Sequence, residues 1–167
     1  KQQLVVSSLA DIKKYAVTNG NRFFGIRHGE STHNAEGKNA GGRETAHLRS
    51  ELTPFGATRV YAATRELKKL KIDLIVASPY HRIQETAKII AKELKVKIVT
   101  DKRLGEIDCG IYNWQSMDAY HKFFTYKMEQ WQRAPEGGET WADLRQRMMD
   151  TIRSLDKKYK NKNILIA

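Results

Sequence analysis

Two side chains that could act together on an anion stand side by side at Arg27 and His28, directly after the apolar run 23–26. An apolar run of this length, bounded by glycine and charged residues, predicts a buried strand, so the pair would lie where that strand ends. Open α/β sheets form their ligand sites beyond the carboxyl ends of the strands. A guanidinium there suits an anionic substrate, and the imidazole could be a nucleophile. The alternative is a surface loop with a chance Arg-His pair.

A second arginine follows another predicted strand. The apolar run 73–77 leads into residues 78–82, Ser-Pro-Tyr-His-Arg. If the two strands are neighbours, Arg27 and Arg82 would converge on one anion, because each guanidinium offers forked N–H donors that match phosphate oxygens. A helix beginning near Ser78 would also direct its N-terminus toward that anion. In this arrangement His28 lies between the two arginines.

Helices and short strands alternate along the chain. Capping residues predict three helices, which begin at Thr53, Ser78 and Thr140. Proline directly follows Thr53 and Ser78, and an acidic residue lies three positions after Thr140. Apolar residues at helical spacing predict a short helix over 8–19 and an aromatic-rich helix over 115–132. Strands are predicted at residues 22–26, 73–77, 96–99 and 164–167. The order predicts the α/β class, with one domain over residues 1–167 and a largely parallel sheet.

Composition limits the partners and the compartment. The formal net charge of +11 attracts anions, but the basic residues are scattered along predicted helix ends, which favours a small phosphorylated substrate or a phosphoprotein over nucleic acid. No apolar run approaches the ~20 residues of a membrane span. Cys109 is the only cysteine, which excludes an internal disulfide and a cysteine metal cluster. These features predict a cytoplasmic protein with no membrane contact; they do not predict its oligomeric state.

Residues 27–34, Arg-His-Gly-Glu-Ser-Thr-His-Asn, resemble the signature of the histidine phosphatase superfamily, the phosphoglycerate-mutase-like proteins. Further segments match in the family's order: residues 52–56, residues 78–82 with Thr86 and Ala87, residues 104–106 with Gly110 and Trp114, and residues 137–140. The matches extend over about residues 22–166. The resemblance implies a three-layer α/β/α sandwich around the parallel sheet.

The resemblance also implies roles for individual residues. His28 would attack phosphorus and form a phosphohistidine, and Glu106 would protonate the leaving oxygen and then accept a proton from the attacking water. Arg27, Asn34 and Arg82 would bind the phosphoryl oxygens, with no metal or other cofactor. Arg43 and His81 are candidate substrate contacts, although a solvated loop cation explains Arg43 equally well.

Three functions remain open at this stage. The first is a phosphatase that hydrolyses a phosphomonoester. The second is a mutase of the same superfamily; such mutases usually carry a longer insertion before the late glycine-rich motif, whereas Glu106 and Gly137 are only 31 positions apart. The third is a noncatalytic phosphate-binding or interaction module of the same fold.

One family feature has no counterpart in the chain. The family carries a second histidine just after its last strand, but the sequence ends at Ala167, before that position. The other histidines, His33, His47, His81 and His121, occupy none of the matching places. We therefore expect a domain that is incomplete at its C-terminus and turns over weakly or not at all, and a longer form that is active.

Overall fold

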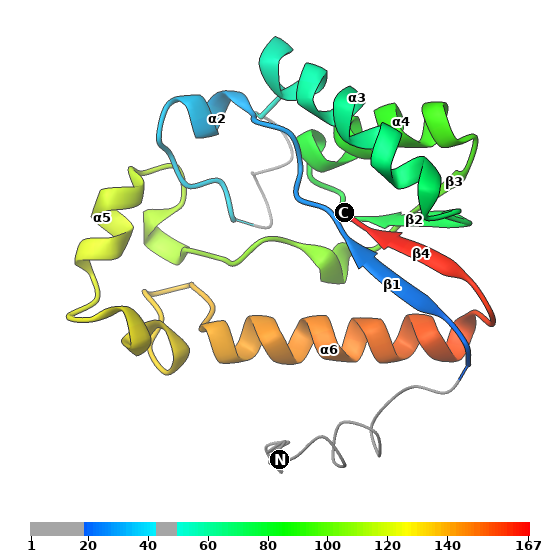
Figure 1. Cartoon of the computed structure of the whole chain (residues 1–167). Coiled ribbons are helices and arrows are strands. Elements are labelled where there is room, and N and C mark those ends of the chain that lie inside the picture. Colours follow the sequence, from blue (N-terminus) through cyan, green and yellow to red (C-terminus); the bar gives the residue numbers. More distant parts are fainter. Residues whose placement is uncertain (1–18, 43–49) are drawn as a thin grey trace.

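The structure is a computed structural model that describes residues 19–42 and 50–167. Within these ranges the central sheet contains four short strands: β1 (Arg22–Gly25), β2 (Leu74–Ala77), β3 (Lys97–Thr100) and β4 (Asn163–Ile166). All strand pairs are parallel, and the order across the sheet is β1-β4-β2-β3 (Figure 1). The strands predicted from the sequence are confirmed, with their ends shifted by one residue.

Helices cover both faces of this sheet. α3 (Pro54–Lys69) and α4 (His81–Leu94) lie on one face, and α6 (Trp141–Lys158) lies on the other (Figure 1). Side chains of a strand alternate between its two faces. In β2, Ile75 and Ala77 accordingly join the core beneath α3 and α4, whereas Leu74 and Val76 join the core that includes Leu155 of α6. The predicted three-layer α/β/α sandwich is confirmed.

Two helices begin where their capping residues predict. The Thr53 hydroxyl accepts a hydrogen bond from the Gly56 amide at 3.0 Å, and Pro54 is the first residue of α3. In α6 the Thr140 hydroxyl accepts from the Asp143 amide at 3.1 Å, and the Asp143 carboxylate accepts from the Thr140 amide at 3.3 Å. These contacts satisfy amides that have no partner within the helix.

The predicted start of α4 at Ser78 is wrong. The Ser78 amide donates to the carbonyl of Ala167 at 3.1 Å, so Ser78 still belongs to the extended chain at the end of β2. The helix begins at His81 after Tyr80, which makes no side-chain capping bond. Pro79 therefore precedes the helix instead of opening it. The first turn nevertheless carries Arg82, as the site requires.

The single helix predicted over 115–132 is also wrong. The structure has a short helix α5 (Met117–Lys122) and, after a break, a 3-10 helix η3 (Lys127–Trp131). The Thr125 amide donates to the Glu129 carboxylate at 2.6 Å instead of continuing the first helix. The break lets Phe124 pack with Tyr120 against Cys109 in a small separate core.

One remaining expectation concerns the N-terminal part, because the helix predicted over 8–19 falls almost entirely outside the described residues. After β1 the chain forms a short helix α2 (Thr32–Ala35), which follows Ser31. Across the described ranges, no helix combines the length and apolar character needed to cross a bilayer.

Candidate active site

The two arginine-bearing segments converge although their strands are not neighbours. The sequence predicts this convergence for strands that are neighbours, but β4 lies between β1 and β2. The carboxyl ends of all three strands still open at one edge of the sheet, because the strands are parallel. There the Arg82 Nε donates to the His28 Nε2 at 3.1 Å. The side chain of Arg82, from the first turn of α4, thus reaches the imidazole of His28.

The partners of the His28 ring define which nitrogen is free to react. Its Nδ1 lies 2.6 Å from the carbonyl oxygen of Gly29, which can only accept, so Nδ1 carries the hydrogen. Nε2 therefore presents its lone pair and accepts from Arg82. Burial lowers the pKa of His28, the Gly29 carbonyl and Glu106 oppose this, and Arg82 and Arg27 add to the lowering. The ring is consequently neutral near pH 7, as a nucleophile must be.

Arg82 is a buried cation, and one nitrogen of its guanidinium has no hydrogen-bond partner in the described part of the chain. It is 1% exposed, its Nη2 donates to the carbonyl of Ala40 at 3.1 Å, and its guanidinium lies 5.0 Å from the Tyr80 ring centre. Its Nη1 has no hydrogen-bond partner among the described residues. A buried donor without a partner is costly, and an anion oxygen would satisfy it. The site is thus built for a negatively charged group.

Asn34 is oriented by a neighbour to which the sequence assigned no role. Its Oδ1 accepts from the Ser31 amide at 3.2 Å and from the Ser31 hydroxyl at 2.8 Å. Its Nδ2 donates to the His33 Nε2 at 3.1 Å. The His33 Nδ1 in turn lies 2.5 Å from the Ser50 hydroxyl and 2.8 Å from that of Ser31. His33 therefore fixes the Asn34 amide, leaving its second N–H for a ligand; only its place next to Asn34 in the motif could have suggested this.

His33 should make the stability of the protein depend on pH. Burial, followed by the positive charge of Arg82, His28 and Arg27, lowers the pKa of His33 from 6.5 to about 4, with Glu36 acting in the opposite direction. Between these two values the unfolded chain binds a proton at this ring and the folded chain does not. The free energy of unfolding should therefore fall as the pH falls through this window, by roughly 1–3 kcal/mol.

Chemical denaturation of the unaltered protein and of His33→Gln tests this, at neutral pH and within the window. We expect the pH dependence to become shallower in His33→Gln, because glutamine does not titrate. His121→Gln removes an exposed imidazole and serves as the matched control, which should keep the original slope. An unchanged slope in His33→Gln would show that other groups cause the loss of stability.

One cavity of about 210 Å³ gathers the residues predicted to do the chemistry. Its lining includes Arg27, His28, Asn34, Arg82 and Glu106. Glu106 comes from the segment after η1 (Lys102–Leu104), and its side chain is exposed to the opening. Five of the seven predicted site residues therefore meet in one place.

The two predicted substrate contacts do not join them. His81 does not line this cavity, and its Nδ1 lies 3.6 Å from the Glu85 carboxylate on the same helix. Arg43 falls outside the described residues. The lining of the cavity also includes the side chains of Met117, Tyr120 and Trp141.

Cys109 also lines the cavity, but it is a poor competitor for the role of nucleophile. Burial, and then the negative charges of Asp108 and Glu106, raise the pKa of its thiol to about 12. The thiolate is the reactive form of cysteine, so the side chain is inert near neutral pH. No group of histidine, cysteine and acidic side chains in the described part of the chain is arranged to hold a metal ion.

Comparison with known proteins agrees with this geometry. The profile of the histidine phosphatase superfamily (branch 1) matches residues 23–167, which include both arginine-bearing segments. The chain belongs to this family. The Hydrogenobacter thermophilus protein named "Putative phosphoserine phosphatase 2" is 34% identical to this histidine phosphatase superfamily member over 107 residues. The alignment covers 62% of this chain and 50% of that protein.

A second curated protein and a solved structure are also similar to this chain. A probable phosphoglycerate mutase of Yersinia enterocolitica is 32% identical over 141 residues, covering 78% of this chain and 61% of that protein. The solved structure of YhfR from Bacillus stearothermophilus superimposes with a TM-score of 0.75 at 25% identity, covering 87% of this chain and 72% of that one. The chain thus spans between half and about three fifths of the curated relatives it matches.

Proposed function

We propose that the protein is a phosphatase that hydrolyses a phosphomonoester through a phosphohistidine at His28. The observation that carries this proposal is the pairing of an unprotonated Nε2 on His28, which accepts from the Arg82 Nε, with the buried Nη1 of Arg82, which has no partner among the described residues. A phosphoryl group entering between the two side chains would take over the N–H groups of Arg82. Its phosphorus would then face the lone pair of His28.

The first chemical step forms the covalent intermediate. The Nε2 lone pair attacks phosphorus and the bond from phosphorus to the leaving oxygen breaks, while Glu106 gives its proton to that oxygen. Arg27, Arg82 and the free N–H of Asn34 stabilise the negative charge on the oxygens that do not react. The products are a phosphohistidine, an alcohol and the Glu106 carboxylate.

The second step returns the site to its starting state. Water attacks the phosphohistidine and the bond from nitrogen to phosphorus breaks. The Glu106 carboxylate accepts the proton of the water. Inorganic phosphate leaves and His28 is again neutral, with its Nδ1 hydrogen still held by Gly29. No metal or other cofactor takes part in this scheme.

The mutase is the second candidate because the Yersinia relative carries that name. The short interval from Glu106 to Gly137 favours hydrolysis. Incubation with phosphoglycerate, with inorganic phosphate and isomerised product measured in the same sample, separates the two activities. We expect phosphate release to dominate, together with a phosphoenzyme that is stable in base and labile in acid. Rapid isomerisation with little hydrolysis would assign the mutase, and the absence of a phosphoenzyme on the longer form of the protein would leave only a binding module.

The substrate class and the compartment belong to the same proposal. A small phosphorylated compound or a phosphoprotein fits a site open on one side, and the buried, unpaired Cys109 is compatible with a reducing cytoplasm. The histidine expected after Ala167 stays a prediction. Ala167 lines a second cavity of about 380 Å³ together with His28 and Glu106, so residues following it would enter the site.

A further inference from the structure

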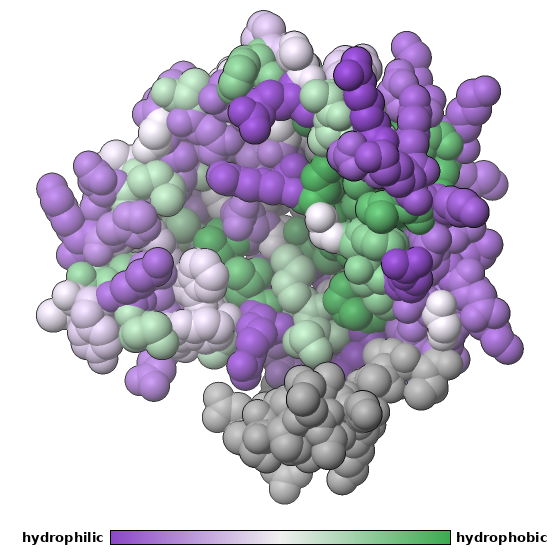
Figure 2. Space-filling view, viewed as in Figure 1, coloured by the Kyte–Doolittle hydropathy of each residue, from purple (hydrophilic) through white to green (hydrophobic). Residues whose placement is uncertain are grey.

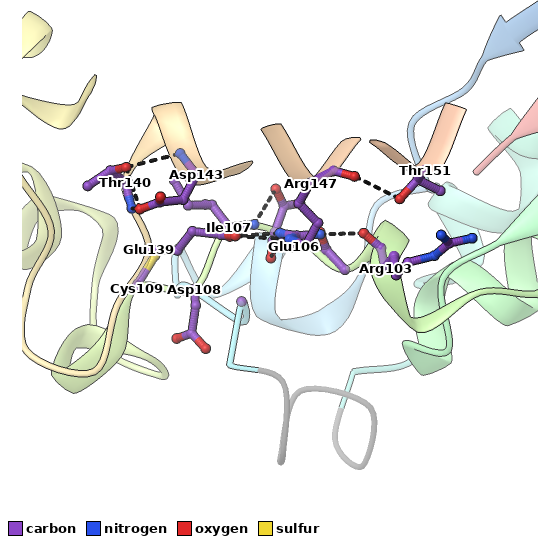
Figure 3. A network of polar contacts seen from close by, with 12 residues as sticks. Arg103, Glu106, Ile107, Asp108, Cys109, Glu139, Thr140, Asp143, Arg147 and Thr151 are labelled. Carbon is purple, nitrogen blue, oxygen red and sulfur yellow. Dashed lines mark hydrogen bonds and ion pairs between the residues drawn. The ribbon is translucent and has the colours of Figure 1, made fainter. Parts of the chain in front are cut away.

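The segment that carries Glu106 is bound by the guanidinium of one arginine in α6. Arg147 of α6 points its side chain at this segment (Figure 3). Its Nη1 donates to the carbonyls of Arg103 at 2.6 Å and of Gly105 at 2.8 Å, and its Nη2 lies 3.5 Å from the Glu106 carbonyl. Three backbone carbonyls in a run of four residues are thus bound by a single side chain.

A carboxylate holds that guanidinium in place. Glu139 accepts from the Arg147 Nε at 2.9 Å and from its Nη2 at 2.7 Å, which is the two-pronged geometry of the strongest ion pairs. The two side chains are only 15% and 7% exposed. The Glu139 amide also donates to the Asp108 carbonyl at 2.8 Å. The pair therefore binds the chain on both sides of Glu106 (Figure 3).

The carboxylate of Glu106 depends on this support. Among the described residues, the one hydrogen bond that it accepts is from the amide of the next residue, Ile107, at 3.3 Å. No described side chain holds it, so the position of its oxygens follows from the position of its backbone. Proton transfer requires a donor within hydrogen-bond reach of the leaving oxygen, and small displacements reduce its rate strongly.

We propose that Arg147 and Glu139 are positioning residues that set the placement of Glu106 for proton transfer to the leaving group. The proposal rests on the phosphatase function proposed above, in which Glu106 is the acid. It also predicts a signature that a purely structural ion pair would not give. Loss of the pair should harm substrates that need a proton on the leaving oxygen and spare those that do not.

Arg147→Lys and Glu139→Gln test this with two substrates. An alkyl phosphate such as glycerol phosphate releases a basic alkoxide unless it is protonated, whereas 4-nitrophenyl phosphate releases a stable phenolate. Lysine keeps the charge of Arg147 but cannot bind three carbonyls and a carboxylate at once. We expect kcat/KM for the alkyl phosphate to fall about 10- to 100-fold, within the range of general acid catalysis. The value for 4-nitrophenyl phosphate should stay within about twofold.

The controls separate positioning from folding. Arg153→Lys alters another α6 arginine that pairs with an acidic residue, Asp150 at 3.6 Å. It should leave kcat/KM unchanged for both substrates. Placing Arg147→Lys in a Glu106→Gln background should cause no further loss, because the group it positions is already absent. Thermal unfolding of each variant reports whether the fold survives. If either Arg147→Lys or Glu139→Gln does not fold, the other variant still tests the positioning role through the difference between its losses in kcat/KM for the two substrates.

The outcomes also distinguish this inference from the function on which it rests. Equal losses for the two substrates, or full additivity with Glu106→Gln, would overturn the positioning role while leaving the phosphatase intact. If the longer form of the protein, without substitutions, forms no phosphoenzyme from 4-nitrophenyl phosphate, the proposed function fails and the inference fails with it.

Discussion

His28→Ala is expected to abolish the phosphoenzyme and to lower turnover by at least about 10⁴-fold, the scale on which removal of a covalent nucleophile acts. The reason is geometric, because in the described site the unprotonated Nε2 of His28 faces Arg82, whereas the buried Cys109 is kept protonated. The measurement is the amount of labelled phosphate retained after the reaction is quenched in base. Turnover of an aryl phosphate gives the second readout.

His28→Asn is the matched variant. Asparagine offers an acceptor to Arg82 and keeps the polarity of the site, but it has no nitrogen lone pair that can attack phosphorus. Both variants should bind phosphate while forming no phosphoenzyme. Retention of label by either variant at the level of the unaltered protein would show that another residue is the nucleophile.

Arg82→Lys is expected to have the second largest effect. A lysine has one nitrogen, so it cannot bind the Ala40 carbonyl, the His28 ring and an anion oxygen at once, as the positions of Nη2, Nε and Nη1 allow. We expect kcat/KM to fall about 10²- to 10³-fold, the usual loss when a buried donor to the transition state is removed. Competitive inhibition by inorganic phosphate should weaken as well. Steady-state kinetics over a range of phosphate concentrations measures both effects.

Arg65→Lys on α3 is the control, because Arg65 is exposed and its replacement should change neither value. Thermal unfolding shows whether Arg82→Lys has lost its fold as well as its ligand. A folded Arg82→Lys with normal phosphate affinity would mean that the anion is bound elsewhere.

Local features of the sequence predicted the frame of the site. The caps at Thr53 and Thr140 and the apolar run 73–77 act through neighbouring residues, so they can be recognised without the fold. The convergence of His28 with Arg82 followed from the rule that parallel strands open at one edge, although β4 lies between their strands. That rule depends on the direction of the strands and not on their order.

The features that were missed depend on contacts between distant segments. Nothing near Arg147 in the sequence distinguishes it from the other basic residues of α6, and its importance comes from the carbonyls that the fold brings to it. The break after α5 likewise reflects a small core around Cys109, and it overrides a pattern typical of one helix. His33 gained its role through Ser50, which is 17 residues further along the chain.

The surface is largely hydrophilic, as the charged composition predicts, and it does not point to a particular class of binding partner. Figure 2 shows hydrophilic side chains over most of the visible face, with apolar ones near its centre. Basic residues such as Lys68 and Lys69 contact acidic neighbours, Glu93 at 3.3 Å and Glu66 at 2.7 Å. Local pairing of this kind is typical of a solvated helix surface and does not by itself indicate a nucleic-acid partner.

The position of β1 in the sheet determines when the site can form during synthesis. Phe24 of β1 lies opposite Leu165 of β4, and among the described strands β1 pairs with β4 alone. The ribosome makes β1 about 140 residues before its partner β4. Until β4 has emerged, β1 has no edge to join, so His28 is not yet held beside Arg82. The contact between these two side chains therefore forms only after nearly all of the described chain has left the ribosome.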